Sequence, residues 1–114
     1  DKEFFRTLDQ FAYRYTRLQD EMGARLIPAT LRAMGEDVTS MAAIDRFNRL
    51  EQLGWLPSTD EWLNIREIRN EFTHDYPEFA ENHVHKLETA LNSAQRLLEI
   101  FDHFSDKIEE RGLI

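Results

Sequence analysis

Apolar side chains recur at alternating steps of three and four residues in two long segments of this sequence. The first segment runs from Glu3 to about Met34, and its apolar series is Phe4, Leu8, Phe11, Tyr15, Leu18 and Met22. The last segment runs to about Arg111, and its series is Val84, Leu87, Leu91, Ala94, Leu98, Phe101 and Ile108. Such spacing aligns side chains along one side of a helix that packs lengthwise on other helices. No segment shows the period-two alternation of a half-buried strand, so we expect an all-helical protein.

Proline, glycine and capping residues predict where these helices bend or end. Pro28 should kink or restart the first helix because it lacks a backbone donor, and Gly35–Val38 should form a loop. Thr39 or Ser40 can cap a second helix, and Gly54 can end it in the left-handed conformation. The apolar side of this second helix is Met41, Ile44, Phe47, Leu50 and Leu53.

A third helix is predicted to begin at the capping box of Ser58 and Glu61. Its apolar side is Trp62, Ile65, Ile68 and Phe72. Pro77 should prevent this helix from continuing past Tyr76, and Asp75 should cap the fourth helix with Pro77 in its first turn. Residues 1–114 are therefore expected to form a single domain, an up-and-down four-helix bundle with short loops.

Composition excludes several classes of function. The chain of 114 residues has no Cys, which excludes disulfides, thiolate nucleophiles and Cys-based zinc sites and is typical of the cytosol. Its net charge of 14 − 22 = −8 argues against a broad nucleic-acid-binding surface. It has no apolar run long enough to span a membrane and no Gly-rich loop typical of a phosphate cofactor site. We therefore expect a cytoplasmic protein without a cofactor. The sequence begins with Asp1 rather than Met, so a missing leader is compatible with it.

Polar residues are concentrated in the stretch REIRNEFTHDYP, from Arg66 to Pro77. Asn70 and His74 are neighbours on one side of a helix, whereas Arg69 and His74 point about 140° apart. The latter two can converge if the helix loosens at His74, or if a second copy of the segment faces the first. His74 is expected in the last helical turn, where the dipole favours imidazolium, beside the amides that start the next helix. An Arg, a His and free amides suit phosphate-ester chemistry.

Two other interpretations need no such chemistry at this stretch. Arg66 and Arg69 can form surface ion pairs with Glu67 or Glu71, in which case the stretch is an ordinary solvated helix face. Glu71 and His74 also form one ExxH unit of the kind found in di-iron bundles, and Glu78 and Glu81 could be enlisted. Such bundles need a second ExxH, and the sequence contains none, so we expect no metal.

The run from Arg69 to Tyr76, RNEFTHDY, resembles the R-N/D-x-x-x-H-x-Y signature of the HEPN superfamily. More narrowly, it is similar to HepT-type toxins that are paired with minimal nucleotidyltransferase (MNT) antitoxins. The resemblance implies a metal-independent, homodimeric endoribonuclease of a type VII-like toxin–antitoxin pair. It implies that Arg69 and His74 are catalytic, with Asn70 assisting them. We further expect Arg66, which precedes the motif, to bind the substrate.

The same resemblance implies a regulatory site and a partner. Tyr76 occupies the place of the tyrosine that the partner nucleotidyltransferase modifies with AMP, and a phosphorylated adduct there would oppose the substrate phosphate. The alternative is a non-catalytic HEPN-like subunit that binds a nucleotidyltransferase as antitoxin or substrate-binding subunit.

Overall fold

The computed structural model describes residues 2–82 and 84–113, and the side chains of residues 2–74 and 85–113. In chain order, its elements are α1 (Lys2–Glu21), a π-helical turn (Met22–Leu26), α2 (Ile27–Ala33), a 3-10 turn (Val38–Ser40), α3 (Ala43–Gln52), α4 (Thr59–Asn82) and α5 (Val84–Glu110). The described residues contain no strand. The prediction of an all-helical bundle is therefore confirmed.

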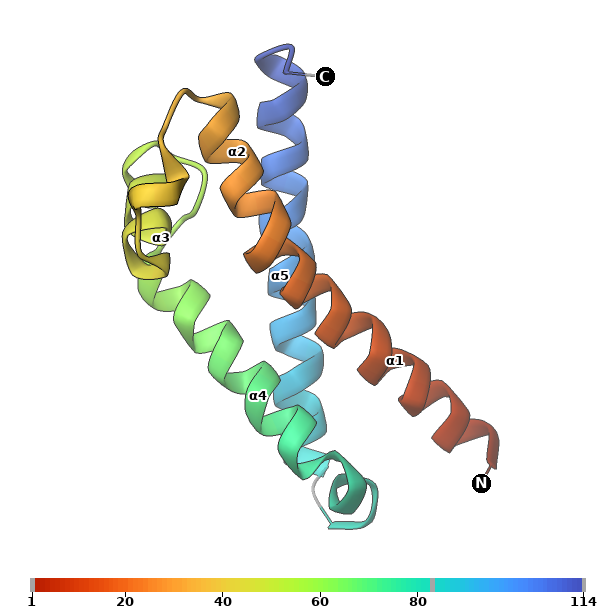
Figure 1. Cartoon of the computed structure of the whole chain (residues 1–114). Coiled ribbons are helices and arrows are strands. Elements are labelled where there is room, and N and C mark those ends of the chain that lie inside the picture. Colours follow the sequence, from red (N-terminus) through yellow and green to blue (C-terminus); the bar gives the residue numbers. More distant parts are fainter. Residues whose placement is uncertain (1, 83, 114) are drawn as a thin grey trace.

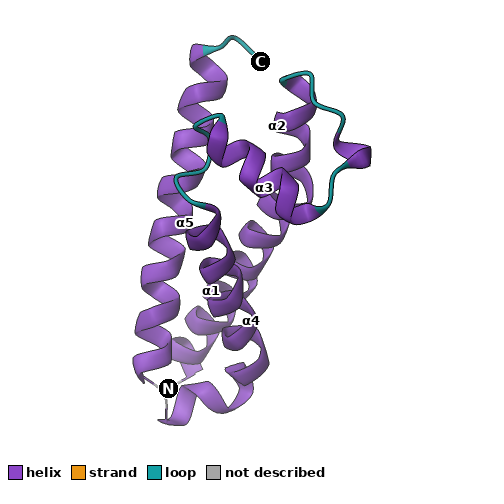
Figure 2. Cartoon of the chain, turned by 90° about the vertical axis from the view of Figure 1, so that its left-hand side faces the viewer, coloured by secondary structure: helices purple, strands orange, loops and turns teal. Residues whose placement is uncertain are grey.

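The long helices are arranged lengthwise (Figure 1). Helix α1 continues through the π-helical turn into α2, and α5 runs in the same direction beside them. Helix α4 runs in the opposite direction, and the short α3 lies next to α2 at the far end of the bundle. Figure 2 shows the loops gathered at the end that carries α2 and α3.

The π-helical turn lies directly before Pro28. The amide of Ile27 donates to the carbonyl of Met22, five residues back, and the helix then resumes with Pro28 in its first turn. A proline cannot donate to the carbonyl four residues back, and a wider turn accommodates that missing hydrogen bond. The irregularity is located where the sequence predicted it, whereas the kink itself stays a prediction.

The predicted cap of the second helix is wrong. The carboxylate of Asp37 accepts hydrogen bonds from the Thr39 amide at 3.2 Å and the Thr39 hydroxyl at 2.7 Å. The Ser40 hydroxyl donates to the Asp37 carbonyl, so both predicted caps are used in the 3-10 turn. Helix α3 begins later, after Ala42, without a side-chain cap. The predicted end is confirmed, because Gly54 follows the helix with a φ of +81°.

The predicted start of the third helix is confirmed, but its predicted end is wrong. The Ser58 hydroxyl accepts a hydrogen bond from the Glu61 amide at 3.1 Å, as an N-cap should. Helix α4 then continues through Pro77 to Asn82, and α5 begins at Val84. An internal proline removes one hydrogen bond and bends a helix without necessarily ending it. Figure 1 shows such a bend where α4, in teal, approaches its end.

The core side of α5 differs from the predicted one. Its buried residues are Ala90, Ser93, Leu97, Ile100 and Phe104. The predicted series lies one step further around the helix, so that Leu91 and Leu98 are each 47% exposed and Phe101 is 40% exposed. Helix α5 carries two adjacent apolar stripes. The buried stripe contains the polar Ser93, so a search for apolar residues alone selects the other stripe.

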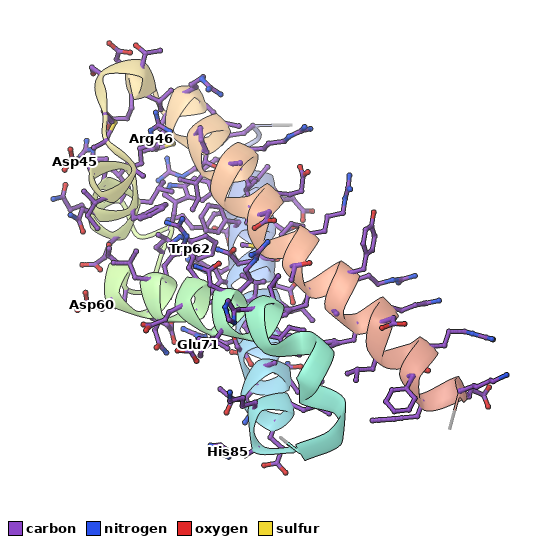
Figure 3. The ribbon with its side chains drawn as sticks, turned by 60° about the horizontal axis from the view of Figure 1, so that its bottom comes forward. Asp45, Arg46, Asp60, Trp62, Glu71 and His85 are labelled. Carbon is purple, nitrogen blue, oxygen red and sulfur yellow. The ribbon has the colours of Figure 1, made fainter. Side chains whose placement is uncertain are left out.

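Contacts of small and aromatic side chains explain which stripe of α5 is buried. The Tyr15 hydroxyl of α1 donates to the Ser93 hydroxyl at 2.9 Å, which turns this side of α5 toward α1. On α4, Trp62, Ile65 and Phe72 are buried as predicted. Figure 3 shows Trp62 among the side chains inside the bundle, while Asp60 lies at the outer end of the same helix.

Candidate functional site

Arg69 is held at the edge between α4 and α1. Its Nη2 donates to Oδ2 of Asp20 at 2.7 Å, and its Nη1 donates to Oδ1 of Asn70 at 3.2 Å. The Arg69 side chain is only 20% exposed, and its Nε is buried without a hydrogen-bond partner. The ion pair joins residues 49 positions apart. The expectation of a pair with Glu67 or Glu71 is therefore wrong for Arg69, because Asp20 on the neighbouring helix is its carboxylate partner.

His74 points away from Arg69. Both residues belong to the uninterrupted helix α4, so their side chains leave it about 140° apart. The hydroxyl of Thr73 donates to the carbonyl of Arg69 at 3.0 Å, within the same helical turn. Of the two alternatives for bringing Arg69 and His74 together, a helix that loosens at His74 is therefore wrong. Within one chain, the structure does not bring the two predicted catalytic residues side by side.

Asn70 and His74 are both exposed and lie one turn apart on the outer side of α4. Because α4 continues to Asn82, His74 is not in its last turn, and no new helix begins directly after it. The predicted contribution of the helix ends to this site is therefore wrong. Tyr76 belongs to α4 by its backbone, and the role predicted for its side chain lies outside the described side chains.

Arg66 lies one turn before Asn70 and contacts α3. Its guanidinium carbon is 5.6 Å from the centre of the Phe47 ring, within range of a cation–π interaction. The Arg66 side chain remains exposed although Phe47 is buried. The structure thus gives Arg66 an aromatic partner on another helix. A planar guanidinium held on a ring stays available for phosphates or bases.

Asp20 and Tyr15 lie near this site, although the sequence indicated no role for Asp20 and placed Tyr15 only in the apolar series of the first helix. The carboxylate of Asp20 pairs with Arg69, and the Tyr15 hydroxyl lies where the positive charge of Arg69 acts on it. Burial raises the pKa of Tyr15, and this effect outweighs the lowering by its hydrogen bond to Ser93 and by Arg69. Neither residue forms a motif with Arg69, because both lie on another helix.

The raised pKa of Tyr15 predicts a loss of stability in alkali. Folding favours the neutral phenol, so this contribution is complete below pH 10.0 and is lost as pH rises through the higher pKa of the folded state. Urea unfolding at pH 8 and at several values above pH 10 measures the loss. Tyr15→Phe should lose less stability over this range than the wild type. Tyr13, which is 62% exposed, gives the matched control Tyr13→Phe, which should behave as the wild type. Equal alkaline losses in all three proteins would contradict the prediction.

The described part of the chain supports neither a metal site nor a membrane-spanning helix. No three His, Asp or Glu side chains among those described are grouped so that they could hold a metal ion. Glu78 and Glu81, which the metal interpretation enlisted, fall outside the described side chains. Among the described helices, none is long and apolar enough to cross a membrane.

Comparisons with protein-family models, with curated proteins and with solved structures gave no match. The function must therefore be argued from the residues on α4 and their neighbours.

Proposed function

We propose that this chain is a metal-independent endoribonuclease of the HEPN type, acting in the cytoplasm as the toxin of a type VII-like MNT/HEPN toxin–antitoxin pair. The observation that carries the proposal is the arrangement around Asn70. This side chain contacts the Arg69 guanidinium at 3.2 Å, and the exposed His74 lies one helical turn further on. The motif therefore combines a fixed cation with an accessible imidazole.

The proposed reaction is an attack within the RNA strand. His74 removes the proton from a ribose 2′-hydroxyl, whose oxygen forms a new bond to the adjacent phosphorus. The bond from phosphorus to the 5′-oxygen of the next nucleotide breaks, and that oxygen takes up a proton as it leaves. Arg69 stabilises the added negative charge on the phosphoryl oxygens. Asn70 orients the guanidinium, and the product carries a 2′,3′-cyclic phosphate.

A second copy of the chain completes the proposed site. One copy cannot place Arg69 and His74 together, because α4 is regular between them. Two α4 helices facing each other can place the Arg69 of one copy beside the His74 of the other, which defines a homodimer with two sites. The exposed apolar residues of α5 do not serve this contact, because they lie on the side of α5 that faces away from Arg96 and its partner Glu61 on α4.

Regulation in this proposal acts through Tyr76. A partner nucleotidyltransferase transfers AMP to the Tyr76 hydroxyl and releases pyrophosphate from ATP. The added phosphate places negative charge two residues after His74, where it repels the RNA backbone. A nucleotidyltransferase is therefore the expected protein partner.

The activity is tested with purified protein and a broad panel of RNAs in the presence of EDTA. The proposal expects cleavage that EDTA does not suppress, with fragments that end in a 2′,3′-cyclic phosphate by mass spectrometry. Fragments that end in a 5′-phosphate and a free 3′-hydroxyl, or cleavage that requires a divalent metal, would contradict the proposed chemistry.

Two observations favour the second candidate, a non-catalytic subunit that binds a nucleotidyltransferase. Asp20 already neutralises Arg69, and the chain carries a net charge of −8. Expression of the chain alone in cells separates the two candidates. A toxin arrests growth, and His74→Ala relieves the arrest. A binding subunit leaves growth unchanged with or without His74.

A further inference from the structure

A pocket of about 300 Å³ lies beside the Arg69–Asp20 ion pair. It is formed where α1, the π-helical turn, α3 and α4 meet, and its lining includes Gln19, Asp20, Gly23, Ala43, Phe47 and Arg66. This volume is at the lower end of the range for small-molecule sites. The pocket thus has room for one small planar group rather than for an extended ligand.

Small residues from two elements line this space. Gly23 belongs to the π-helical turn, and a Cβ placed there would lie 3.6 Å from a ring carbon of the buried Trp62. Ala43 is the first residue of α3 and is exposed. The pocket lining at Gly23 therefore lies against the core, whereas Ala43 borders the pocket on the solvent side. Single π-helical turns are frequent at functional sites.

The polar side chains of the pocket match the groups of a nucleobase. Arg66 presents a planar guanidinium already placed over Phe47, and bases stack on such planes. The carboxylate of Asp20 accepts hydrogen bonds, as an exocyclic amino group requires. Gln19, only 4% exposed, adds an amide that can both donate and accept. Uracil lacks an exocyclic amino group and offers the carboxylate only its ring N3–H, which two carbonyl oxygens flank.

Asp20 connects the pocket with the proposed catalytic residue. The carboxylate both lines the pocket and pairs with Arg69 at 2.7 Å. A ligand in contact with Asp20 is therefore about one side chain away from the Arg69 guanidinium. The positive charge of Arg69 also offsets the negative charge of the Asp20 carboxylate, and this reduces the repulsion of a bound phosphate.

We propose that this pocket binds one base of the RNA substrate next to the cleaved phosphate, and that it favours bases with an exocyclic amino group. The proposal that this base belongs to the substrate rests on the proposed ribonuclease function. Binding of a single nucleotide to the pocket does not require cleavage, so the two proposals can be tested separately.

The test is titration of the full chain with AMP, CMP, GMP and UMP, followed by NMR of the backbone amides. The amide signals of Gly23 and Ala43 should shift and saturate with the three amino-bearing nucleotides, at concentrations at least about tenfold lower than with UMP. Ala43→Leu fills the pocket from an exposed helical position and should weaken binding about tenfold or more. Ala29→Leu is the matched control, because Ala29 is exposed on α2 and outside the pocket lining, and it should bind as the wild type.

Each other outcome has a distinct meaning. Equal shifts with UMP, or shifts that Ala43→Leu leaves unchanged, would overturn the pocket assignment. Selective binding that Ala43→Leu removes, in a protein that cleaves no RNA, would retain the pocket and reject the ribonuclease. RNA cleavage with the same base preference in wild type and Ala43→Leu would retain the ribonuclease and reject the pocket.

Discussion

Leu97→Ala is expected to lower the free energy of unfolding by about 2–5 kcal/mol, whereas Leu98→Ala should change it by less than about 1 kcal/mol. The two leucines are adjacent on α5, but Leu97 is fully buried and Leu98 is 47% exposed. Truncation at Leu97 removes apolar contacts and leaves a cavity in the core. Truncation at Leu98 leaves a smaller side chain on a surface that water already reaches.

Urea unfolding of the two variants and the wild type measures this difference. Both substitutions replace Leu with Ala on the same helix, so helix propensity cancels between them. Equal destabilisation would contradict the helix orientation in the structure. A larger loss for Leu98→Ala would favour the side of α5 that the apolar spacing alone predicted.

Arg69→Ala and His74→Ala are each expected to reduce kcat/KM for RNA cleavage by about 10²–10⁴. His74→Ala removes the proposed base, and Arg69→Ala removes the cation that stabilises charge in the transition state. His74 is exposed, so its substitution should change the free energy of unfolding by less than about 1 kcal/mol. Arg69→Ala also removes the ion pair with Asp20. Because the Asp20 side chain is 56% exposed, the free energy of unfolding should fall by no more than about 1 kcal/mol.

A matched variant separates catalysis from folding in this experiment. Asn64→Ala removes an exposed polar side chain elsewhere on α4 and should retain full activity. Wild-type rates for His74→Ala would contradict the role of the imidazole. A loss of activity in Asn64→Ala equal to that in His74→Ala would indicate general damage to α4.

The helical class of the fold could be predicted because it depends on local patterns. The spacing of apolar residues identifies helices whatever they pack against, and Gly54 and Ser58 act within one or two turns. The orientation of α5 could not be predicted in the same way. It depends on the contact of Tyr15 with Ser93, 78 positions apart, which no local pattern contains.

The errors at the helix ends share one physical cause. Asp37 competes for Thr39 and Ser40, and a long helix accommodates Pro77 with a bend. In both places, the sequence identifies a real irregularity of the backbone, but another local structure than the predicted one satisfies the same backbone groups. The predicted ion pair of Arg69 with Glu67 or Glu71 on its own helix fails for a different reason. The partner of Arg69 is a residue of α1, and a single sequence carries no sign of that pairing.

The composite site is tested most directly with mixed dimers. Arg69→Ala and His74→Ala chains are co-expressed with different tags, and the dimer that carries both tags is purified. Each variant alone should be inactive. The mixed dimer should recover about half of the wild-type activity, because one of its two sites combines an intact Arg69 with the intact His74 of the other copy. A dimer of Arg69→Ala with the double variant Arg69→Ala/His74→Ala contains no Arg69 and should stay inactive. A mixed dimer as inactive as its parents would contradict a site shared between two copies.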